Sequence, residues 1–212
     1  MRKSERAGAS IPMLHAEKKE EVDSLIRTSQ SDPLRIDDVS IDGTSGLIGL
    51  TFCPGKIQKG ALSGPWVRDL KVDLEVIRAW GAATWVNLLT RDEMVRLGVG
   101  DMKEVVENFG AGIRYFHLPI EDTSVPDPQF EERWEDVGRE IRDDLINGRK
   151  VLIHCKGGLG RTGTIAARLL VELGVEPDAA ILRVRQARPG AIENALQESH
   201  VRSVRSRNCS MA

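Results

Sequence analysis

Short apolar runs alternate with longer amphipathic segments through most of the chain. Four of the apolar runs have the length of a β-strand: residues 46–52 (GLIGLTF), 83–89 (ATWVNLL), 113–120 (IRYFHLPI) and 150–155 (KVLIHC). A Pro-Gly turn follows the first run, and such turn residues favour the end of a strand. Because these runs show no polar alternation, they are typical of strands in a parallel sheet that is covered on both faces.

Between the apolar runs, hydrophobic residues recur at helical spacing. In residues 69–82 they include Leu70, Leu74 and Ile77, and Gly81 is expected to end that helix. The same spacing predicts short helices over 91–97 and 101–109, a long helix over 126–148, and further helices over 161–174, 176–190 and 193–206. Strands separated by helices predict one α/β domain with a central, mainly parallel sheet flanked by helices.

Residues 1–33 are polar and precede this pattern. We expect them to form an N-terminal extension that is partly mobile, with one short helix over residues 14–28. The α/β domain is then expected to span residues 34–206, and residues 207–212 to form a C-terminal tail. The sequence contains neither an internal repeat nor a low-complexity tract.

The composition is ordinary for a globular domain and argues against several classes of function. Of the 212 residues, 41% are apolar and 29% are charged, and the net charge is −2. This balance gives no reason to expect nucleic acid or an anionic membrane as a partner. No run reaches the about 20 apolar residues of a membrane span, and the N-terminus lacks the apolar core of a secretory signal. We therefore expect a cytoplasmic protein, and the sequence leaves its oligomeric state open.

The three cysteines, Cys53, Cys155 and Cys209, lie far apart and form no C-x-x-C pair. Because zinc sites and thioredoxin-type sites need such a spacing, the sequence predicts neither a metal site nor a dithiol redox centre. Cys155 lies in a glycine-rich loop, where a single cysteine suggests a nucleophile. Whether Cys53 or Cys209 is its partner under oxidation is left open.

That loop, HCKGGLGRTG at residues 154–163, joins a predicted strand to a predicted helix and admits two interpretations. Its G-L-G-R-T-G matches the G-x-G-x-x-G of a dinucleotide-binding turn, which also needs an acidic residue about 20 positions later at the tip of a strand. Glu176 and Asp178 lie near that position, but Pro177 predicts the start of a helix there. A P-loop nucleotidase fits less well still, because no lysine follows the glycines in G-K-[ST] spacing.

The second interpretation uses every residue of the loop. Backbone N–H groups between Cys155 and Arg161 can point inward and form a concave anion site, and the following helix adds its positive dipole end. The same field favours the thiolate of Cys155, and the guanidinium of Arg161 can fork two phosphate oxygens. Glycines permit the close backbone approach that such a cradle needs. The residues expected to bind the phosphate are Lys156, Gly157, Gly158, Leu159, Gly160 and Arg161.

Three residues beside the cradle are expected to support it. The hydroxyl of Thr162 can hydrogen-bond the cysteine sulfur and make it a better leaving group in a second step. His154 is expected to order the loop by hydrogen bonding, and Gly163 completes the pattern HCKGGLGRTG.

The loop resembles the signature H-C-x-x-G-x-x-R-[ST]-G of the cysteine-dependent protein tyrosine phosphatase superfamily and matches it at every fixed position. Within that superfamily the chain is most similar to the kinase-associated, dual-specificity branch, known for acting on cyclin-dependent kinases. The similarity runs from about residue 46 to residue 197 and includes the segments TRDE, LPIED and GAI-x-x-x-x-Q. It implies a single α/β domain, a phosphocysteine intermediate and no cofactor.

The resemblance also implies which residue is the acid. Cleavage of a phosphate ester needs a proton donor for the leaving oxygen. In the family the donor is the aspartate of a P-I-x-D stretch, which is Asp122 here, and the same carboxylate acts as the base in the second step. Glu121 and Asp127 are the other candidates in LPIEDTSVPD. Gln197 matches the family's water-positioning glutamine, whereas Glu193 stands where close relatives carry another glutamine.

The resemblance implies a phosphorylated protein as substrate, with a kinase as one candidate. Phosphotyrosine is the expected target, together with phosphoserine and phosphothreonine, because the chain lacks the W-P-D tripeptide of the larger tyrosine-specific enzymes. Lys156 matches the phosphoinositide-directed loop H-C-K-A-G-K-G-R-T-G, but Leu159 replaces its second lysine. A phosphatase of phosphoinositides or small phosphoesters therefore stays an alternative, as does a catalytically inactive phosphate-binding module.

Overall fold

A five-stranded sheet forms the centre of the molecule in the computed structural model, which describes residues 26–61 and 64–206. In spatial order its strands are β1 (Asp37–Ser40), β2 (Leu47–Thr51), β7 (Lys150–His154), β5 (Ala82–Asn87) and β6 (Arg114–His117). Strands β2, β7, β5 and β6 run parallel, and only β1 pairs in the antiparallel direction, at one edge. The predicted α/β domain with a mainly parallel sheet is confirmed.

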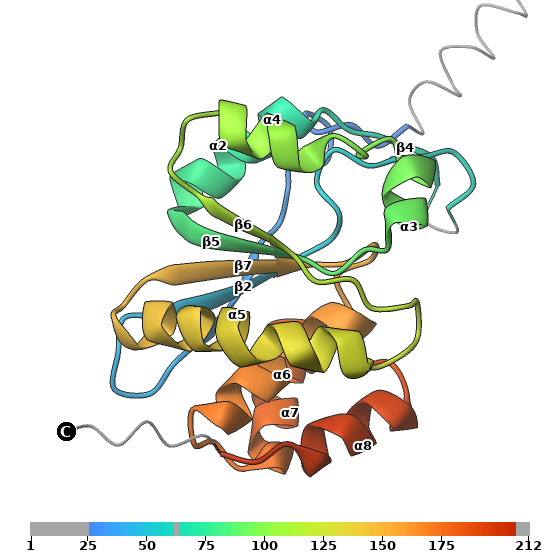
Figure 1. Ribbon diagram of the computed structural model, residues 1–212. Helices are drawn as coiled ribbons and strands as arrows, with labels where there is room; N and C mark the ends of the chain where they lie inside the picture. The colour runs from blue at the N-terminus through green and yellow to red at the C-terminus, as the bar shows by residue number, and fades with distance from the viewer. Residues whose placement is uncertain (1–25, 62–63, 207–212) are drawn as a thin grey trace, which may run out of the picture.

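Helices cover both faces of this sheet (Figure 1). One face carries α2 (Leu70–Trp80), α3 (Arg91–Arg96) and α4 (Met102–Asn108), and the other carries α5 (Pro128–Ile146), α6 (Gly160–Glu172), α7 (Pro177–Ala187) and α8 (Ala195–Ser203). Two clusters of buried hydrophobic side chains fill the two layers. All seven predicted helices between residues 69 and 206 are present.

Local capping explains why these helices begin and end where the sequence predicts. Asp69 accepts hydrogen bonds from the first turn of α2, and Gly81 ends that helix in the left-handed conformation at φ 89°. Asp127 caps α5, which begins with Pro128 at its first position. Both arrangements satisfy backbone groups that a helix end leaves unpaired.

The strand ends carry the loops that form the candidate site. The register pairs Asn87 with His154, Thr51 with His154 and Asn87 with His117, so the carboxyl ends of the four parallel strands are level. Ligands of parallel α/β sheets bind beyond these ends. The loop after β7 therefore lies among the loops that follow β2, β5 and β6.

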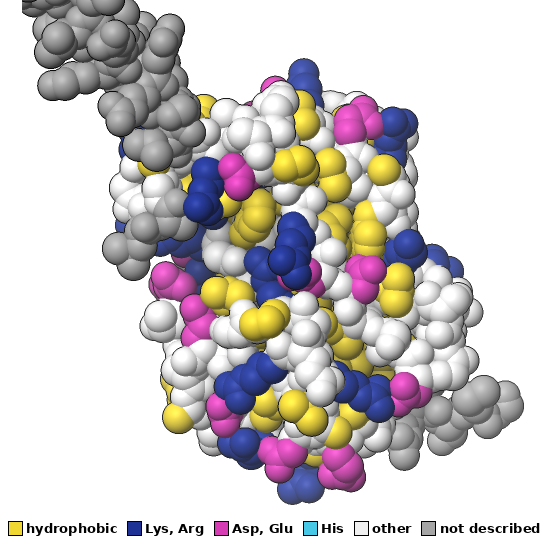
Figure 2. All heavy atoms as spheres, turned by 180° about the vertical axis from the view of Figure 1, so that it is seen from behind, with side chains coloured by type: hydrophobic (Ala, Val, Ile, Leu, Met, Phe, Trp, Pro, Cys, Tyr) yellow, Lys and Arg dark blue, Asp and Glu magenta, His cyan; other side chains and the backbone are white. Residues whose placement is uncertain are grey.

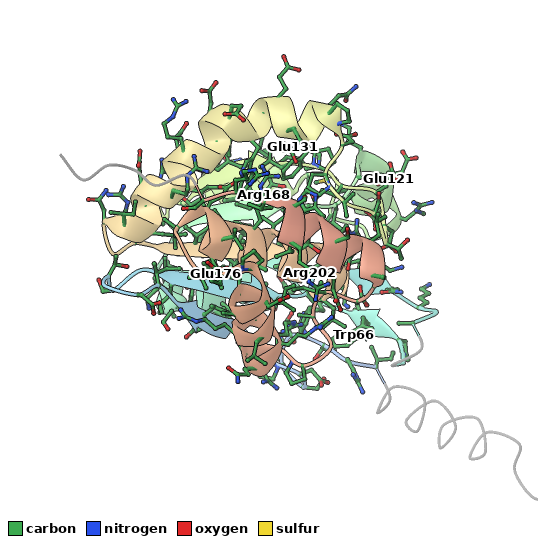
Figure 3. All side chains as sticks on the ribbon, turned by 90° about the horizontal axis from the view of Figure 1, so that it is seen from below. Trp66, Glu121, Glu131, Arg168, Glu176 and Arg202 are labelled. Carbon is green, nitrogen blue, oxygen red and sulfur yellow. The ribbon has the colours of Figure 1, made fainter. Side chains whose placement is uncertain are left out.

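A buried ion-pair cluster holds α5 against α6. Arg168 forks the carboxylate of Glu131 at 2.6 and 2.7 Å and also bonds Glu172 at 2.9 Å. Glu172 further accepts hydrogen bonds from Trp134 and from Arg142. Figure 3 shows Arg168 and Glu131 next to each other between the two helices. This cluster anchors the far end of α6, whose first turn forms part of the cysteine loop.

Three strands were not predicted from the sequence. Strand β1 reads DDVS, and only Val39 of its four residues is buried, so the hydrophobic pattern is too weak to reveal it. Strands β3 (Ile57–Gln58) and β4 (Trp66–Val67) have two residues each and pair with one another. A two-residue strand is too short to show any periodicity.

The helix predicted over residues 14–28 falls mostly on residues 1–25, which lie outside the described part. For residues 26–28 the prediction is wrong: Arg27 donates its N–H to the Pro65 carbonyl at 2.9 Å and accepts from Val67 N–H at 3.0 Å. This pairing with β4 replaces the helical hydrogen bonds. The boundary at residue 33 stays a prediction, and the tail at 207–212 lies outside the described residues.

Acidic and basic side chains are mixed over the face opposite to that of Figure 1. Figure 2 shows them next to each other there, with scattered hydrophobic side chains between them. Of the helices that the structure describes, none is long and apolar enough to cross a membrane.

Candidate active site

The cysteine loop, residues 155–161, connects β7 to α6. The Gly158 N–H donates to the Cys155 sulfur at 3.3 Å, and Cys155 is only 3% exposed. Gly158 has φ 72°, and a Cβ there would lie closer than 3.0 Å to the backbone of Thr51 and Phe52. The loop therefore needs glycine at this position, both for its conformation and for its close approach to the end of β2.

Arg161 is 2% exposed, and its guanidinium is held on several sides. It donates to the two carboxylate oxygens of Glu93 at 2.6 and 2.8 Å and to the Ile120 carbonyl at 2.9 Å. Burial lowers the pKa of Arg161, but the hydrogen bonds to Glu93 and the charges of Cys155, Glu93 and Asp122 together hold it above its ordinary value. The structure thus keeps a permanent positive charge at the cysteine loop.

Glu93 is the functional residue that sequence reasoning missed. It lies in the first turn of α3, where it forms a capping box with Thr90, and the same carboxylate pairs with Arg161. Burial raises the pKa of Glu93, but hydrogen bonds from Arg161 and from the Thr90 backbone hold it below its ordinary value. The segment TRDE contained a signal, because T-x-x-E before an apolar run is a capping box. Nothing in that pattern reveals Arg161 as the partner.

Asp122 lies on the Asp122 loop, residues 118–125, which follows β6. Its carboxylate contacts the Arg161 guanidinium at 2.9 Å, and its side chain is 57% exposed. Glu121 is exposed as well, whereas Asp127 accepts a hydrogen bond from Phe130 N–H at the start of α5. Of the three acids considered from the sequence, Asp122 is the one that the structure brings to Arg161.

Residues 192–197, which we call the Glu193 segment, form hydrogen bonds with both the cysteine loop and the Asp122 loop. The carboxylate of Glu193 accepts the Gly160 N–H at 2.8 Å. The buried Gln197 accepts from Glu193 N–H at 2.9 Å and donates to the Ser124 carbonyl at 3.3 Å. Asn194 donates to the Thr123 carbonyl at 2.9 Å. Both polar atoms of the Gln197 side chain therefore hold loops together, and its role in positioning water stays a prediction.

The flanking residues of the loop are buried. His154 Nδ1 lies 3.3 Å from the Cys155 carbonyl, and its ring packs edge-on against Trp85. Burial lowers the pKa of His154 to about 3, so the imidazole is neutral. The Thr162 hydroxyl is buried and has no hydrogen-bond partner among the described residues. Its predicted bond to the sulfur stays a prediction.

Two more positions of the predicted cradle, and Gly163 beside it, have structural contacts. The Leu159 carbonyl accepts the Gly163 N–H at 2.7 Å, and the Gly157 carbonyl accepts from Arg188 at 3.2 Å. A Cβ on Gly163 would lie closer than 3.0 Å to Ala191 and to the Ile192 backbone. Packing of α6 against the segment that leads into α8 therefore requires glycine at position 163, the last residue of HCKGGLGRTG.

A groove of about 450 Å³ opens beside the cysteine loop. Its wall includes Thr90, Glu93, Arg96, Asp122, Lys156 and the apolar Ile57. Lys156 is half-buried, and its carbonyl accepts the Cys53 N–H at 3.3 Å. A positively charged cradle with a thiol at its base and a carboxylic acid at its rim can bind a phosphate ester and cleave it.

The other interpretations find less support in the geometry. Glu176 precedes α7 and Asp178 lies in its first turn, so neither stands at a strand tip where a dinucleotide ribose would be held. Cys53 is fully buried, and burial raises the pKa of its thiol. Within residues 26–61 and 64–206, no group of three His, Cys, Asp or Glu side chains is arranged to hold a metal ion.

Comparison with known proteins agrees with this site. The family model described as "Polymorphic toxin system, DSP-PTPase phosphatase" matches residues 66–175. The chain is 32% identical over 164 residues to cyclin-dependent kinase inhibitor 3 of Rattus norvegicus. The aligned residues cover 76% of this chain and 73% of the relative. The chain belongs to the dual-specificity branch of the cysteine-dependent protein tyrosine phosphatases.

Solved structures show the same relationship. A crystal structure of kinase associated phosphatase, with its catalytic-site cysteine replaced by serine, superposes with a TM-score of 0.70 at 30% identity over 80% of this chain and 93% of that chain. The PRL-1 phosphatase of Drosophila melanogaster is 37% identical over 90 residues, which are 42% of this chain and 49% of the relative. This chain is therefore a cysteine-dependent protein phosphatase, as its loop predicted.

Proposed function

We propose that the chain hydrolyses phosphotyrosine, phosphoserine and phosphothreonine in proteins through a phosphocysteine on Cys155. The observation that carries the proposal is the position of Arg161. Glu93 fixes this guanidinium at the cysteine loop, and Asp122 contacts it from the opposite loop at 2.9 Å. Nucleophile and phosphate-binding group thereby come from the cysteine loop, and the acid comes to the same place from the Asp122 loop.

In the first step the thiolate of Cys155 attacks phosphorus, so an S–P bond forms and the bond to the leaving oxygen breaks. Backbone N–H groups and Arg161 take up the charge on the non-bridging oxygens. Asp122 gives its proton to the leaving oxygen. A bound phosphate replaces the Asp122 carboxylate on Arg161, because both are anions that bind the same guanidinium, and the released carboxylate takes up a proton from solvent before it acts as the acid.

In the second step water attacks the phosphorus of the phosphocysteine. Asp122 takes a proton from the water, the S–P bond breaks, and Cys155 leaves as the thiolate. The hydroxyl of Thr162, which has no partner among the described residues, is free to donate to that sulfur. Gln197 and Glu193 hold the two loops together during both steps.

We propose a phosphorylated protein, and among such proteins a kinase, as the substrate. One observation supports this choice: the chain resembles proteins whose names refer to kinases. The groove wall carries Lys156, but Leu159 supplies no second charge to the loop, which disfavours a multiply phosphorylated inositol ring. We place the reaction in the cytoplasm, where a thiol nucleophile stays reduced.

Turnover of an aryl phosphate and of phosphopeptides tests the mechanism. Cys155→Ser should abolish turnover while still binding phosphopeptide. Asp122→Ala should lower kcat by about 10² to 10⁴, most for alkyl phosphates with poor leaving groups. Glu121→Ala is the matched control, since it removes the neighbouring exposed carboxylate. Substantial turnover by Cys155→Ser contradicts the phosphocysteine, and equal losses in the two acid variants contradict the role of Asp122.

A further inference from the structure

A second groove of about 410 Å³ lies on the other side of α3 from the catalytic groove. We call it the β6 groove, because it runs along the edge strand β6. Figure 1 shows β6 at the edge of the sheet, between α4 on one side and α5 on the other. Its wall includes Arg91, Met94, Lys103, Tyr115, His117 and Arg133.

The charge of the β6 groove has a single sign. Arg91, Lys103 and Arg133 line it, and no aspartate or glutamate does. Within the part of the chain that the structure describes, Arg91 and Arg133 form no ion pair or side-chain hydrogen bond. Lys103 has only a long, exposed contact of 3.7 Å with Glu107. Three cations on one wall without neutralising carboxylates attract an anion.

Two of these cations share the groove wall with His117, at the end of β6. Burial lowers the pKa of His117, and the charges of Arg91 and Arg133 lower it further. The ring nitrogen Nε2 lies 2.7 Å from the Leu89 carbonyl. A neutral imidazole therefore lines the groove together with two guanidinium groups, one from the start of α3 and one from α5. An acidic group entering the groove would meet both.

Apolar side chains lie next to this charge. Val95 is 73% exposed, and Met94 and the half-buried Phe116 also line the groove. A cationic groove with apolar walls suits a peptide whose acidic side chains are followed by aliphatic or aromatic ones.

Helix α3 separates the β6 groove from the catalytic groove. Thr90, Glu93 and Arg96 face the catalytic groove, whereas Arg91 and Met94 face the β6 groove. A helix with its side chains is about 10 Å across, and an extended chain advances about 3.3 Å per residue. A single peptide therefore reaches from one groove to the other in about three to five residues.

We propose that the β6 groove binds acidic side chains of the substrate protein, about three to five residues from the phosphorylated residue in the catalytic groove. The inference rests on the proposed function, because it assigns the same substrate a second point of attachment. A peptide fits better than a lipid headgroup, since only a chain bridges two grooves on opposite sides of a helix.

The turnover of four phosphotyrosine peptides tests the proposal. One peptide has alanines around the phosphotyrosine, two have a Glu-Glu pair four residues before or after it, and one has the pair nine residues away. We expect kcat/KM to rise by up to about tenfold for one of the two near peptides, because each surface ion pair contributes a factor of up to about five. The gain should shrink in high salt. Equal values for all four peptides would overturn the proposal.

Substitution in the groove identifies the residues responsible. Arg91→Gln combined with Arg133→Gln should abolish the preference between near and far Glu-Glu pairs. Arg139→Gln, an exposed position on the same helix as Arg133, is the matched control and should keep the preference. A preference that survives in the double variant places the acidic subsite elsewhere and overturns the assignment.

Peptide binding to the Cys155→Ser protein separates this inference from the proposed function. Failure of the unaltered protein to cleave an aryl phosphate contradicts the function, whereas equal Kd values of Cys155→Ser for near and far peptides contradict the groove. Binding of phosphatidylcholine vesicles that contain phosphatidylinositol phosphate tests whether the groove recognises a lipid headgroup instead of a peptide. If these vesicles bind through Arg91 and Arg133 while the peptides show no preference, the groove recognises lipid and the proposal is wrong.

Discussion

Replacing Glu93 by glutamine removes the charge that pairs with Arg161 and orients it. The glutamine side chain has nearly the same shape as the glutamate side chain. The carboxylate accepts hydrogen bonds at 2.6 and 2.8 Å from a guanidinium that is 2% exposed. Glutamine keeps one acceptor and turns an amide N–H group toward another donor. A hydrogen bond to a charged group contributes about 1.5 to 3 kcal/mol. We therefore expect the free energy of unfolding to fall by about 2 to 3 kcal/mol.

The catalytic effect should have a similar size, because Arg161 is the residue proposed to bind the transferring phosphoryl group. A loss of about 2 to 3 kcal/mol corresponds to a drop of roughly 30- to 150-fold in kcat/KM for an aryl phosphate. Asp73→Asn is the matched control. The buried Arg68 donates to both carboxylate oxygens of Asp73 in α2, at 2.7 and 2.9 Å, and among the described residues neither side chain hydrogen-bonds to residues 155–161.

Both variants should show comparable losses of stability in denaturant unfolding, yet only Glu93→Gln should lose activity at a temperature where both are folded. If Glu93→Gln retains kcat/KM within about threefold of the wild type, the orientation of Arg161 does not depend on Glu93. Equal losses of activity in both variants would show a general effect of destabilisation instead.

Two further predictions concern the same loop. Gly158→Ala should lower stability by about 2 to 4 kcal/mol in thermal unfolding, since it adds a Cβ against the Thr51 backbone at positive φ; Gly157→Ala, with open space around it, should change stability little. The pKa of His154 falls from 6.5 to about 3 on folding, so the unfolded chain binds the extra proton as the pH drops below 6.5. Stability should therefore fall by about 2 kcal/mol between pH 6.5 and pH 5 through this residue, and His154→Phe should flatten that part of the curve. Equal stability of the two glycine variants, or an unchanged pH slope in His154→Phe, would contradict these assignments.

The sequence carried enough information for the sheet and for the loop that bears the nucleophile. Parallel buried strands leave unbroken apolar runs, and KVLIHC is such a run at the centre of the sheet. The cysteine loop is local, so the residues from Cys155 to Arg161 determine most of its shape. The polar β1 and the two-residue strands β3 and β4 were missed, because their partners in the sheet rather than their own side chains define them.

The candidate site was predictable only where its residues are neighbours in sequence. The contact between Arg161 and Glu93 spans 68 positions, and the contact between Asn194 and Thr123 spans 71. Such pairs depend on which loops the order of the strands in the sheet brings together, and no local sequence motif determines this order. The family resemblance supplied Asp122, but it gave no reason to connect TRDE with the arginine.

The two carboxylates on Arg161 differ in burial, and this difference suits the two tasks that the reaction requires. Glu93 is held in the first turn of a helix with its side chain 10% exposed, so removing it would leave a buried charge without a partner. Asp122 is 57% exposed on a loop, where water replaces the lost contact at little cost. An incoming phosphate can therefore displace Asp122 and leave Glu93 in place. In the proposed mechanism, Arg161 thereby keeps its orientation while Asp122 is released to serve as the acid for the leaving oxygen.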